Sequence, residues 1–476
     1  MRPLVAAIAL TCCGMCGVSS AAPAAEAMDP GLERFRPAPY VRIQHPEWSK
    51  DATIYELNLR QFTREGTLAA AERELPRLKS LGVGIVWLMP IHPIGEKNRK
   101  GGRGSPYSVR DYRAVNPDYG TLDDLRRFVK AAHGLGLRVI LDWVANHSAW
   151  DNPLVTEHPE WYSRDWKGEF HPTSWNDWSD IIEFDYDQPG LRRWMTESLA
   201  YWVREADIDG YRCDVAGFVP LDFWETARRE LEAIKPVFML GEWEATDLHA
   251  AAFDATYAWG WYNAAREATA GKRGAGPFRG YYSTHDNAWP AGVMRMTFVT
   301  NHDKNSWDGT EFEEFGPGLD AVTVLSFVGD GIPLVYNGQE AGNDRRLAFF
   351  ERDPIAWRDH PRGELYRRLI EFKKAQPALW NGPWGARMID VPNGAQDRLL
   401  TFVRGEGPHR VFAAFNFSGQ TVKTTLGHAP YPGRYVDFNG GATVELAEGD
   451  AIELPAWGWR VLAASAAPTP GRANRE

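Results

Sequence analysis

The sequence predicts an α/β protein: a (β/α)8 TIM barrel with a short loop domain inserted after its third strand and an antiparallel β-sandwich domain at its C-terminal end. Three observations lead to this prediction. Eight short apolar runs alternate with amphipathic helical stretches between about residue 52 and residue 375. The alternation is interrupted over residues 148–187, and after Pro383 it gives way to short runs separated by Gly, Asn and Pro.

The eight apolar runs have the character of strands that are buried on both faces. They are rich in Val, Ile and Leu and do not alternate strictly with polar residues, which is typical of a parallel sheet covered by helices. The runs are Thr53–Leu57, Gly84–Met89, Arg138–Trp143, Ile208–Asp214, Val237–Glu242, Phe253–Tyr257, Arg295–Asn301 and Ile332–Asn337. Eight strand-then-helix units favour a closed barrel over an open doubly wound sheet.

Two of the intervening helices are indicated by a start signal or by their periodicity. Thr121 is followed three residues later by Asp124, which predicts a capped helix start, and apolar residues then recur at helical spacing as far as Gly134. A second stripe with the same period consists of Leu191, Trp194, Met195, Leu199, Trp202 and Val203. Both patterns predict helices that turn one face toward a core.

The two interruptions predict two further domains. Residues 148–187 combine five Trp with Gly, Pro, Asn, Asp and Ser, and a loop of this length with such aromatic content is expected to be functional. After residue 382 the alternating runs and turn residues predict antiparallel strands. We therefore predict barrel segments at 28–147 and 188–382, an inserted domain at 148–187, a C-terminal β domain at 383–466 and a polar tail at 467–476.

The first 27 residues predict a secretory signal peptide. Arg2 precedes an apolar run from Leu4 to Met15, and small residues follow as far as Ala27. The run is too short to span a membrane and no other stretch reaches 18 apolar residues, so we expect no transmembrane segment. The expected location is therefore the periplasm or the extracellular medium.

The cysteines and the charge narrow the class of protein further. Cys12, Cys13 and Cys16 lie in the predicted signal peptide, where a lipid anchor on one of them is the alternative, and Cys213 stands alone in the remaining chain. No disulfide framework is therefore expected. The 63 acidic residues outnumber the 53 basic ones and give a net charge of −10, which argues against a dedicated nucleic-acid-binding protein.

Polar residues follow four of the predicted strands at their carboxyl ends. In a barrel of this type the catalytic groups lie at that end of the strands. One strand end of this kind is most simply a helix cap or a surface charge, but four together indicate an active site. The residues are Asp142, Asn146 and His147 after the third strand, Arg212 and Asp214 on the fourth, Glu242 on the fifth, and His302 and Asp303 after the seventh.

The pattern predicts two carboxyl groups with different roles. Arg212 and Asp214 are two residues apart on one strand and point to the same side, whereas Cys213 points away from them as a small buried residue. We expect Arg212 to lower the pKa of Asp214 and keep it ionised as a nucleophile. Glu242 follows an apolar run and precedes Trp243, surroundings that would raise its pKa and suit a general acid. Carboxyl groups whose pKa values are moved apart are what glycoside hydrolysis requires.

These four segments resemble the four hallmark regions of the α-amylase family, glycoside hydrolase family 13. They occur in the family's order and span residues 142–303. The resemblance extends upstream to residues 104–107 and 111–112, downstream to residues 331–340, and to the C-terminal β domain. It therefore covers most of the chain after the signal peptide.

The resemblance implies a role for each of the matching residues. Asp214 would be the nucleophile, Glu242 the general acid and base, and Asp303 the residue that favours the distorted sugar of the transition state. We expect the carboxyl groups of Asp214 and Glu242 to lie about 5–5.5 Å apart, the separation of a retaining enzyme. His147, His302, Arg212, Tyr107 and Trp243 would contact the sugar or orient the nucleophile, and Asp142 would be a structural aspartate beneath the site.

The chemistry implied by the family needs no cofactor, but a structural Ca²⁺ is possible. Asn146 matches a position that often binds this ion in the family, and it could equally be an amide that satisfies its own loop. Ca²⁺ takes six to eight oxygen ligands, and the carboxylates near enough in sequence are Asp151, Asp165, Asp177 and Asp180. No particular set of ligands can be chosen from the sequence.

The tryptophans divide into two groups. Trp194 and Trp202 lie on a helical stripe and are expected in the core. Five others occupy strand ends or the inserted segment, where a flat indole ring can stack on a sugar, and we expect two or three of them to do so. These are Trp143, Trp150, Trp178, Trp243 and Trp307.

The resemblance predicts an enzyme that hydrolyses α-1,4-glucosidic bonds in starch, glycogen or malto-oligosaccharides, acting as a monomer. The alternatives on the same site are a cyclomaltodextrinase or neopullulanase, an α-glucosidase and a transglycosylase. Residues 180–184 match neither the oligo-1,6-glucosidase nor the neopullulanase version of a specificity motif in that region. A catalytically inactive glucan-binding relative is a further alternative, disfavoured because all three carboxylates are present.

Overall fold

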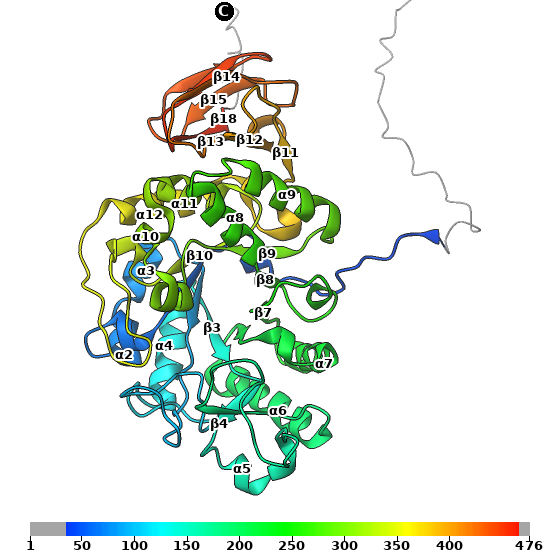
Figure 1. Cartoon of the computed structure of the whole chain (residues 1–476), viewed down its shortest axis with the longest axis vertical. Helices are drawn as coiled ribbons and strands as arrows, with labels where there is room; N and C mark the ends of the chain where they lie inside the picture. The colour runs from blue at the N-terminus through cyan, green and yellow to red at the C-terminus, as the bar shows by residue number, and fades with distance from the viewer. Residues whose placement is uncertain (1–34, 466–476) are drawn as a thin grey trace, which may run out of the picture. The chain divides into compact units, whose positions relative to one another are not determined.

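The computed structural model describes residues 35–465, and these contain a closed barrel of eight parallel strands. The order around the barrel is β1-β10-β9-β8-β7-β6-β3-β2. Figure 1 labels β3, β7, β8, β9 and β10 among these strands. The strands are β1 (Ile54–Leu57), β2 (Ile85–Leu88), β3 (Arg138–Trp143), β6 (Gly210–Cys213), β7 (Phe238–Gly241), β8 (Ala255–Tyr257), β9 (Met294–Thr297) and β10 (Ile332–Tyr336). Seven of the eight predicted runs contain one of these strands and the run Arg295–Asn301 overlaps β9, so the predicted barrel is confirmed.

The end of the seventh predicted strand was placed too late in the chain. The run Arg295–Asn301 was expected to be extended throughout, but β9 ends at Thr297. A loop follows, in which the Asn301 side chain accepts a hydrogen bond from the Lys304 N–H at 2.8 Å. A single π-helical turn then covers Lys304–Asp308. His302 and Asp303 therefore form the start of this helical segment, and the Asn301 side chain caps it.

The helices pack around the strands, and the predicted capped start is confirmed. Asp124 N–H donates to Thr121 Oγ1 at 3.2 Å and Thr121 N–H donates to Asp124 Oδ2 at 2.7 Å, a reciprocal capping box. The helices are α1 (Leu59–Phe62), α2 (Leu68–Arg73), α3 (Leu75–Leu81), α4 (Leu122–Gly134), α5 (Leu154–Glu157), α6 (Pro189–Ala206), α7 (Leu221–Glu232), α8 (Trp259–Thr269), α9 (Gly276–Ala288), α10 (Glu311–Phe315), α11 (Leu319–Val328) and α12 (Pro361–Ala375). Within α6 the predicted stripe is buried apart from Trp194, which is partly buried.

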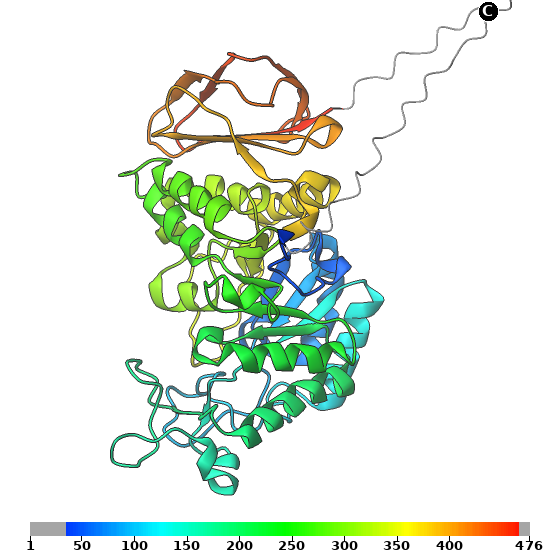
Figure 2. The ribbon, with the colours of Figure 1, turned by 90° about the vertical axis from the view of Figure 1, so that its right-hand side faces the viewer.

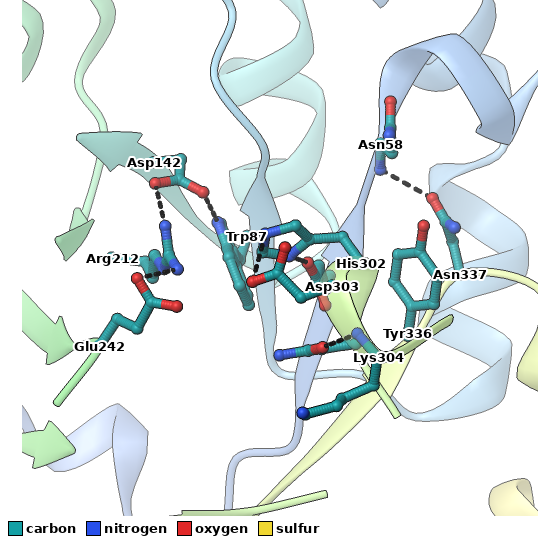
Figure 3. Close-up of polar contacts among 12 residues, drawn as sticks. Asn58, Trp87, Asp142, Arg212, Glu242, His302, Asp303, Lys304, Tyr336 and Asn337 are labelled. Atoms are coloured by element: carbon teal, nitrogen blue, oxygen red, sulfur yellow. Dashed lines mark hydrogen bonds and ion pairs between the residues drawn. The ribbon is translucent and has the colours of Figure 1, made fainter. Parts of the chain in front are cut away.

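The first and last strands of the barrel are joined by side chains as well as by their backbones. Tyr55 Oη donates to Glu340 Oε1 at 2.5 Å. The Asn58 N–H donates to Asn337 Oδ1 at 2.7 Å, as Figure 3 shows. Because β1 pairs with β10 along residues 54–56, these contacts close the barrel. Residues more than 270 positions apart in sequence are thus brought together at one seam.

The segment between β3 and α6 is held at its base by a small sheet. Strand β4 (His147–Ala149) pairs antiparallel with β5 (Ile181–Glu183), and His147 lies opposite Glu183. Trp161 in this segment is buried, whereas Trp166 and Trp175 are almost fully exposed. The inserted segment therefore begins and ends beside the carboxyl end of β3.

Two antiparallel sheets follow the barrel, and together they confirm the predicted C-terminal β-sandwich (Figure 2). One has the strand order β11-β12-β13-β18-β15-β16, and the other pairs β14 with β17. The strands are β11 (Met388–Asp390), β12 (Leu399–Arg404), β13 (Val411–Asn416), β14 (Val422–Thr425), β15 (Gly433–Asp437), β16 (Thr443–Leu446), β17 (Ala451–Leu454) and β18 (Trp459–Ala464).

Strands β12 and β13 contribute to two different cores because successive side chains point to opposite faces. On one face Leu399 and Phe412 pack with residues of β14 and β17, between the two sheets. On the other face Phe402 and Phe415 belong to the large core that also contains the barrel. The ring of Phe417, just after β13, lies 4.9 Å from that of Phe278 on α9.

Several predictions concern residues that the structure does not describe or boundaries that it does not test. The predicted signal peptide at 1–27 and polar tail at 467–476 lie outside residues 35–465. The boundaries proposed for the inserted and C-terminal domains stay predictions. Among the described residues, no helix combines the length and the apolar character that crossing a membrane requires.

Candidate active site

A cavity of about 480 Å³ lies at the carboxyl ends of the barrel strands and brings together residues from segments far apart in the sequence. A larger hollow of about 980 Å³ between α3 and α12 contains none of the predicted site residues. The smaller cavity is lined by Lys100, Ser105, Tyr107, His147, Asp177, Trp178, Asp180, Ile181, Asp214, Val215, Glu242, His302, Asp303, Trp307, Phe349 and Phe350. The predicted catalytic trio Asp214, Glu242 and Asp303 is therefore gathered in one place.

Arg212 holds three carboxylates around one guanidinium group. Its Nη1 lies 2.8 Å from Asp142 Oδ1 and 3.0 Å from Asp214 Oδ1, and its Nη2 lies 2.8 Å from Glu242 Oε2 (Figure 3). Arg212 is fully buried on β6, and the next strand in the barrel on one side is β3, on the other β7. The three carboxylates thus come from three neighbouring strands. Cys213, between Arg212 and Asp214, is buried.

The backbone after β6 also contacts the second carboxylate. The Val215 N–H donates to Glu242 Oε2 at 2.8 Å. Val215 has φ 36° and ψ 48°, a left-handed conformation that is costly for a β-branched residue. This strained turn directs the N–H toward Glu242. Oε2 therefore carries the two interactions that favour negative charge, and Oε1 is the oxygen on which a proton would reside.

Asp142 lies beneath the cavity and uses both of its oxygens. Oδ1 binds Arg212, while Oδ2 accepts hydrogen bonds from Trp87 Nε1 at 3.1 Å and from Tyr107 Oη at 3.0 Å (Figure 3). It is almost completely buried and does not line the cavity. Its position suits the structural role that was predicted for it.

His302 connects the cavity to Glu56 on β1, the strand that pairs with β10 to close the barrel. Its Nδ1 lies 2.5 Å from Glu56 Oε1 and its Nε2 lies 2.9 Å from Tyr107 Oη. Burial lowers the pKa of His302, but Asp303 and Glu56 outweigh that effect and raise the pKa to about 9. At neutral pH both ring nitrogens therefore carry protons. His302 donates to Glu56 and Tyr107, and Tyr107 donates in turn to Asp142.

Arg212 lowers the pKa of Asp214 as predicted, but the expected result, an Asp214 that Arg212 keeps ionised, was wrong. Burial raises the pKa of Asp214 well above its usual range, and the neighbouring Glu242 and Asp142 add to this rise against the pull of Arg212. The physical reason is that one guanidinium charge is shared among three buried carboxylates. Burial also raises the pKa of Glu242, in the predicted direction. We conclude that Asp214 and Glu242 together retain a proton where isolated carboxylates would have lost it.

Residues 44–376, more than half of the chain, match the family model described as the alpha amylase catalytic domain. The chain belongs to the α-amylase family. It is 29% identical over 402 residues to α-amylase MalA of Haloarcula japonica, a match covering 80% of this chain but only 57% of that protein. The chain thus spans little more than half the length of this relative.

Solved structures extend the likeness across the whole fold of this α-amylase family member. The noncanonic maltogenic α-amylase AmyB from Thermotoga neapolitana has a TM-score of 0.81 and 30% sequence identity, covering 88% of this chain and 100% of AmyB. An α-amylase from Lactobacillus plantarum has a TM-score of 0.77 and 30% identity, covering 87% of this chain and 99% of that one. Both matches include the barrel and the C-terminal sheets, because they cover nearly the full length of those chains.

Two predicted sugar contacts of this family member, His147 and Tyr107, line the cavity. Burial lowers the pKa of His147 to about 4, so the ring is neutral at pH 7. Asn146 Nδ2 lies 3.2 Å from His147 Nδ1, so Nδ1 accepts this hydrogen bond and Nε2 carries the proton. The Tyr107 ring is already stacked on His302 at 5.4 Å between centroids, and its stacking on a sugar stays a prediction.

The structure separates the five tryptophans that were proposed as sugar platforms. Trp178 and Trp307 line the cavity, and Trp307 is half exposed. Trp143 is completely buried. Trp150 lies under the Lys97 ammonium, 5.3 Å from its ring centre, and does not line the cavity. Trp243 does not line the cavity either.

The indole of Trp243 packs against a neighbour on the β6 side of the site. Its ring lies 5.1 Å from that of Phe218, and Phe218 lies 6.4 Å from Trp178. A Cβ on Gly217 would lie only 2.2 Å from the Trp243 ring, so the glycine is needed for this packing. Trp243 therefore packs against Phe218 outside the cavity lining, and its direct contact with a sugar stays a prediction.

Sequence reasoning missed three features of the site. Glu56, the partner of His302, is an acidic residue inside an apolar strand, and that contrast was a usable signal. Lys100 lines the cavity from the loop after β2, and nothing in its sequence surroundings distinguishes it from the nearby basic residues. Phe349 and Phe350 reach the cavity from a loop after β10 whose path cannot be read from the sequence.

The residues near Asn146 do not fit a calcium site. Asn146 Nδ2 donates to Thr173 Oγ1 at 2.8 Å, and within residues 35–465 no group of three or more acidic, His or Cys side chains is arranged to hold a metal. The candidate carboxylates already have other partners. Asp151 lies 3.6 Å from Arg110, Asp165 accepts backbone N–H groups of its own turn, and Asp177 and Asp180 both face Lys100.

Proposed function

We propose that the chain is a retaining α-glycoside hydrolase that cleaves α-1,4-glucosidic bonds in starch, glycogen or malto-oligosaccharides. The observation that carries this proposal is the buried Arg212, which binds Asp214 and Glu242 through neighbouring nitrogens at the wall of one cavity. Membership of the α-amylase family supports the same conclusion. The relatives' names support the choice of α-glucans as substrates.

The first step would be attack on the anomeric carbon. Asp214 Oδ1 is bound by Arg212, so Oδ2 is the oxygen available to form the bond to C1. As that bond forms, the glycosidic C–O bond breaks and Glu242 transfers its proton to the departing oxygen. The product is a β-glycosyl ester of Asp214 and a free sugar chain.

The second step would reverse the roles. Glu242, now ionised, takes a proton from a water molecule whose oxygen attacks C1 on the other face of the sugar. The ester bond to Asp214 breaks, and the sugar leaves with its original α configuration. One proton shared by the Asp214–Glu242 pair is what this cycle needs, and the raised pKa values of both groups favour its retention. We expect a carboxyl separation of about 5–5.5 Å, and one above about 6.5 Å would indicate an inverting enzyme.

The same residues would serve a transglycosylase if a sugar hydroxyl replaced water in the second step. An α-glucosidase or a cyclomaltodextrinase would also use them. Product analysis with maltoheptaose and soluble starch separates these subtypes. We further propose that residues 1–27 direct export and are then removed, which the apolar run and small residues of that segment support. We also propose that the protein acts as a monomer.

Replacement of the general acid tests the proposal. We expect Glu242→Gln to lower the rate of maltoheptaose hydrolysis by about 10²–10⁴-fold, the usual contribution of general acid–base catalysis, while glucan binding is retained. The matched control is Glu225→Gln on α7, which is outside the cavity and keeps full activity. Undiminished hydrolysis by purified Glu242→Gln protein would show that another residue supplies the proton.

A further inference from the structure

The barrel order defines which end of the cavity receives the retained part of the substrate. Glu242 follows β7, and β1 is four strands away from β7 in either direction around the ring of eight. The leaving chain must lie beside Glu242, because that residue protonates its oxygen. The C4 hydroxyl of the retained sugar lies across the ring from C1, and it therefore points toward β1.

On the β1 side, the loops that follow β2 and β10 are joined. The Arg103 N–H donates to the Phe350 carbonyl at 3.0 Å, and the Gly102 N–H donates to Glu351 Oε1 at 2.5 Å. Gly101 has φ +63°, and a Cβ there would lie 2.4 Å from Phe350 Cβ. A side chain on either glycine would therefore push the loop after β2 away from the loop after β10. The wall formed by Phe349 and Phe350 is continuous with the loop that carries Lys100.

Lys100 joins this wall to the inserted segment. Its Nζ donates to the Asp177 carbonyl and lies 3.6 Å from Asp177 Oδ1 and 3.9 Å from Asp180 Oδ1. All three residues line the cavity, and the Lys100 side chain is only 26% exposed. A continuous boundary therefore runs from the inserted segment through Lys100 to Phe350 on the side to which the C4 hydroxyl points.

Asp180 adds a polar group to this boundary. Its side chain is 6% exposed, and its Oδ2 has no hydrogen-bond partner although it is buried at the cavity wall. A buried carboxylate oxygen without a donor is costly. A hydroxyl of a terminal sugar would supply the missing donor.

The opposite side of the site is different in character. Val215 lines the cavity there, and the nearby Phe218 is 42% exposed. Phe218 lies between Trp178 and Trp243, so an aromatic surface continues outward from the position of the leaving group. A long leaving chain can be accommodated on this side, whereas the β1 side is bounded.

We propose that Lys100 closes the end of the cavity that receives the retained sugar, so that the enzyme acts on the non-reducing ends of α-glucans and releases short products. Asp180 Oδ2 accepts a hydrogen bond from a hydroxyl of the terminal glucosyl unit. This inference rests on the proposed function, because the position of the leaving group is taken from the role of Glu242. It specifies Lys100 as a residue that determines specificity, not one that takes part in the chemistry.

The test compares two substrates that differ only at the non-reducing end. One is maltoheptaose, and the other is maltoheptaose whose terminal glucosyl unit carries a 4,6-O-ethylidene group. We expect the wild-type protein to consume the blocked substrate about 100-fold more slowly, the upper range of what extra bulk costs in a closed pocket. We expect Lys100→Ala and Lys100→Met to reduce this difference to less than about tenfold, because the boundary opens.

Two further variants separate specificity from damage to the fold. Lys100→Arg can bridge to Asp177 again and should restore most of the discrimination. Lys97→Ala lies in the same loop, is exposed and does not line the cavity, so it should behave as wild type. Equal consumption of both substrates by the wild type would overturn the inference, as would unchanged discrimination in Lys100→Ala and Lys100→Met. No consumption of unblocked maltoheptaose would instead refute the proposed function, and the inference with it.

Discussion

At the site, two buried positive charges are shared among a larger number of carboxylates, and this determines which carboxyl groups keep a proton. Arg212 supplies one positive charge to Asp142, Asp214 and Glu242, so the carboxyl pair retains a proton. His302 supplies the other nearby charge and shares it between Glu56 and Asp303. The role of Arg212 is therefore to orient two oxygens and leave two others reactive, because its fork contacts one oxygen of each catalytic carboxylate.

His92 is a buried imidazole that should destabilise the folded protein in acid. Its ring lies among Tyr112, Trp143 and Trp202, and its Nε2 has no hydrogen-bond partner. Burial lowers its pKa to about 4, below the ordinary value of about 6.5. As the pH falls through 6.5 toward 4, the unfolded chain binds a proton that the folded chain cannot, and stability is lost.

Replacing His92 should remove this acid-dependent loss. We expect the free energy of unfolding of His92→Leu, relative to wild type, to improve by about 2 kcal/mol between pH 7 and pH 5. Thermal unfolding at the two pH values measures the change. The control is Leu137→Ala, a buried position that does not titrate, whose deficit should be the same at both. A constant difference for His92→Leu would mean that the ring takes up a proton as readily in the folded state as in the unfolded chain.

For single residues, the sequence predicted which side chains lie at the site better than it predicted how they interact there. Asp214, Glu242 and Asp303 were found because polar residues at the ends of apolar strands stand out. The raised pKa of Asp214 could not be predicted, since it depends on Asp142 and Glu242 arriving from neighbouring strands. The position of Trp243 could not be predicted either, because it depends on the absence of a side chain at Gly217.

Strand β6 carries Arg212, Asp214 follows it directly, and its first residue must be a glycine. Gly210 has φ +146°, and a Cβ at this position would lie 1.9 Å from the Phe238 carbonyl oxygen on β7. The two strands pair at these residues. Any side chain here would force β6 away from β7 and displace both functional residues.

We expect Gly210→Ala to lower the free energy of unfolding by at least about 4 kcal/mol, among the largest effects of single substitutions, and to abolish activity. The matched control is Gly134→Ala in α4, where a Cβ would meet nothing within 4 Å. That variant should be neutral or more stable by up to about 1 kcal/mol, because alanine is the better helix former. Melting temperatures of the two purified variants decide the matter, and a Gly210→Ala protein as stable as wild type would contradict the steric argument.

Elements with a strong period were predictable, and connections were not. Strand β3 and helix α4 were found at or near their observed limits because apolar periodicity and a capping box mark them. The pairing of β4 with β5 was not foreseen, since each has three residues and they lie more than 30 positions apart. The pairing of such short strands depends on the path of the loop between them, which the sequence pattern does not show.

The barrel and the C-terminal sheets share one large core, and we expect the stability of this core not to depend on a metal in the inserted segment. Phe402 and Phe415 lie in the same buried cluster as the barrel strands. We expect removal of calcium with EDTA to leave the melting temperature unchanged. A structural ion bound at 100 times its dissociation constant would contribute about 2.7 kcal/mol, and its loss would lower the melting temperature by several degrees.

The contrary result would be a lower melting temperature that calcium restores and magnesium does not. It would mean that Asn146 binds the ion together with groups other than the carboxylates of the inserted segment that are already paired. The sequence left calcium open because it shows which carboxylates are near Asn146 along the chain, but not that Lys100 and Arg110 face them.

The seam between β1 and β10 has a consequence for synthesis and folding. Glu56 pairs with His302, and Tyr55 pairs with Glu340, across 246 and 285 residues of chain. At 5–20 residues per second, roughly 15–60 s separate the translation of β1 from that of β10. Glu56 cannot pair until His302 has emerged, and Tyr55 cannot bind Glu340 until β10 and the residues after it have followed. The nascent chain therefore has no glucan-cleaving activity before its barrel is complete, and fragments that end before β10 should be inert as well as slow to fold.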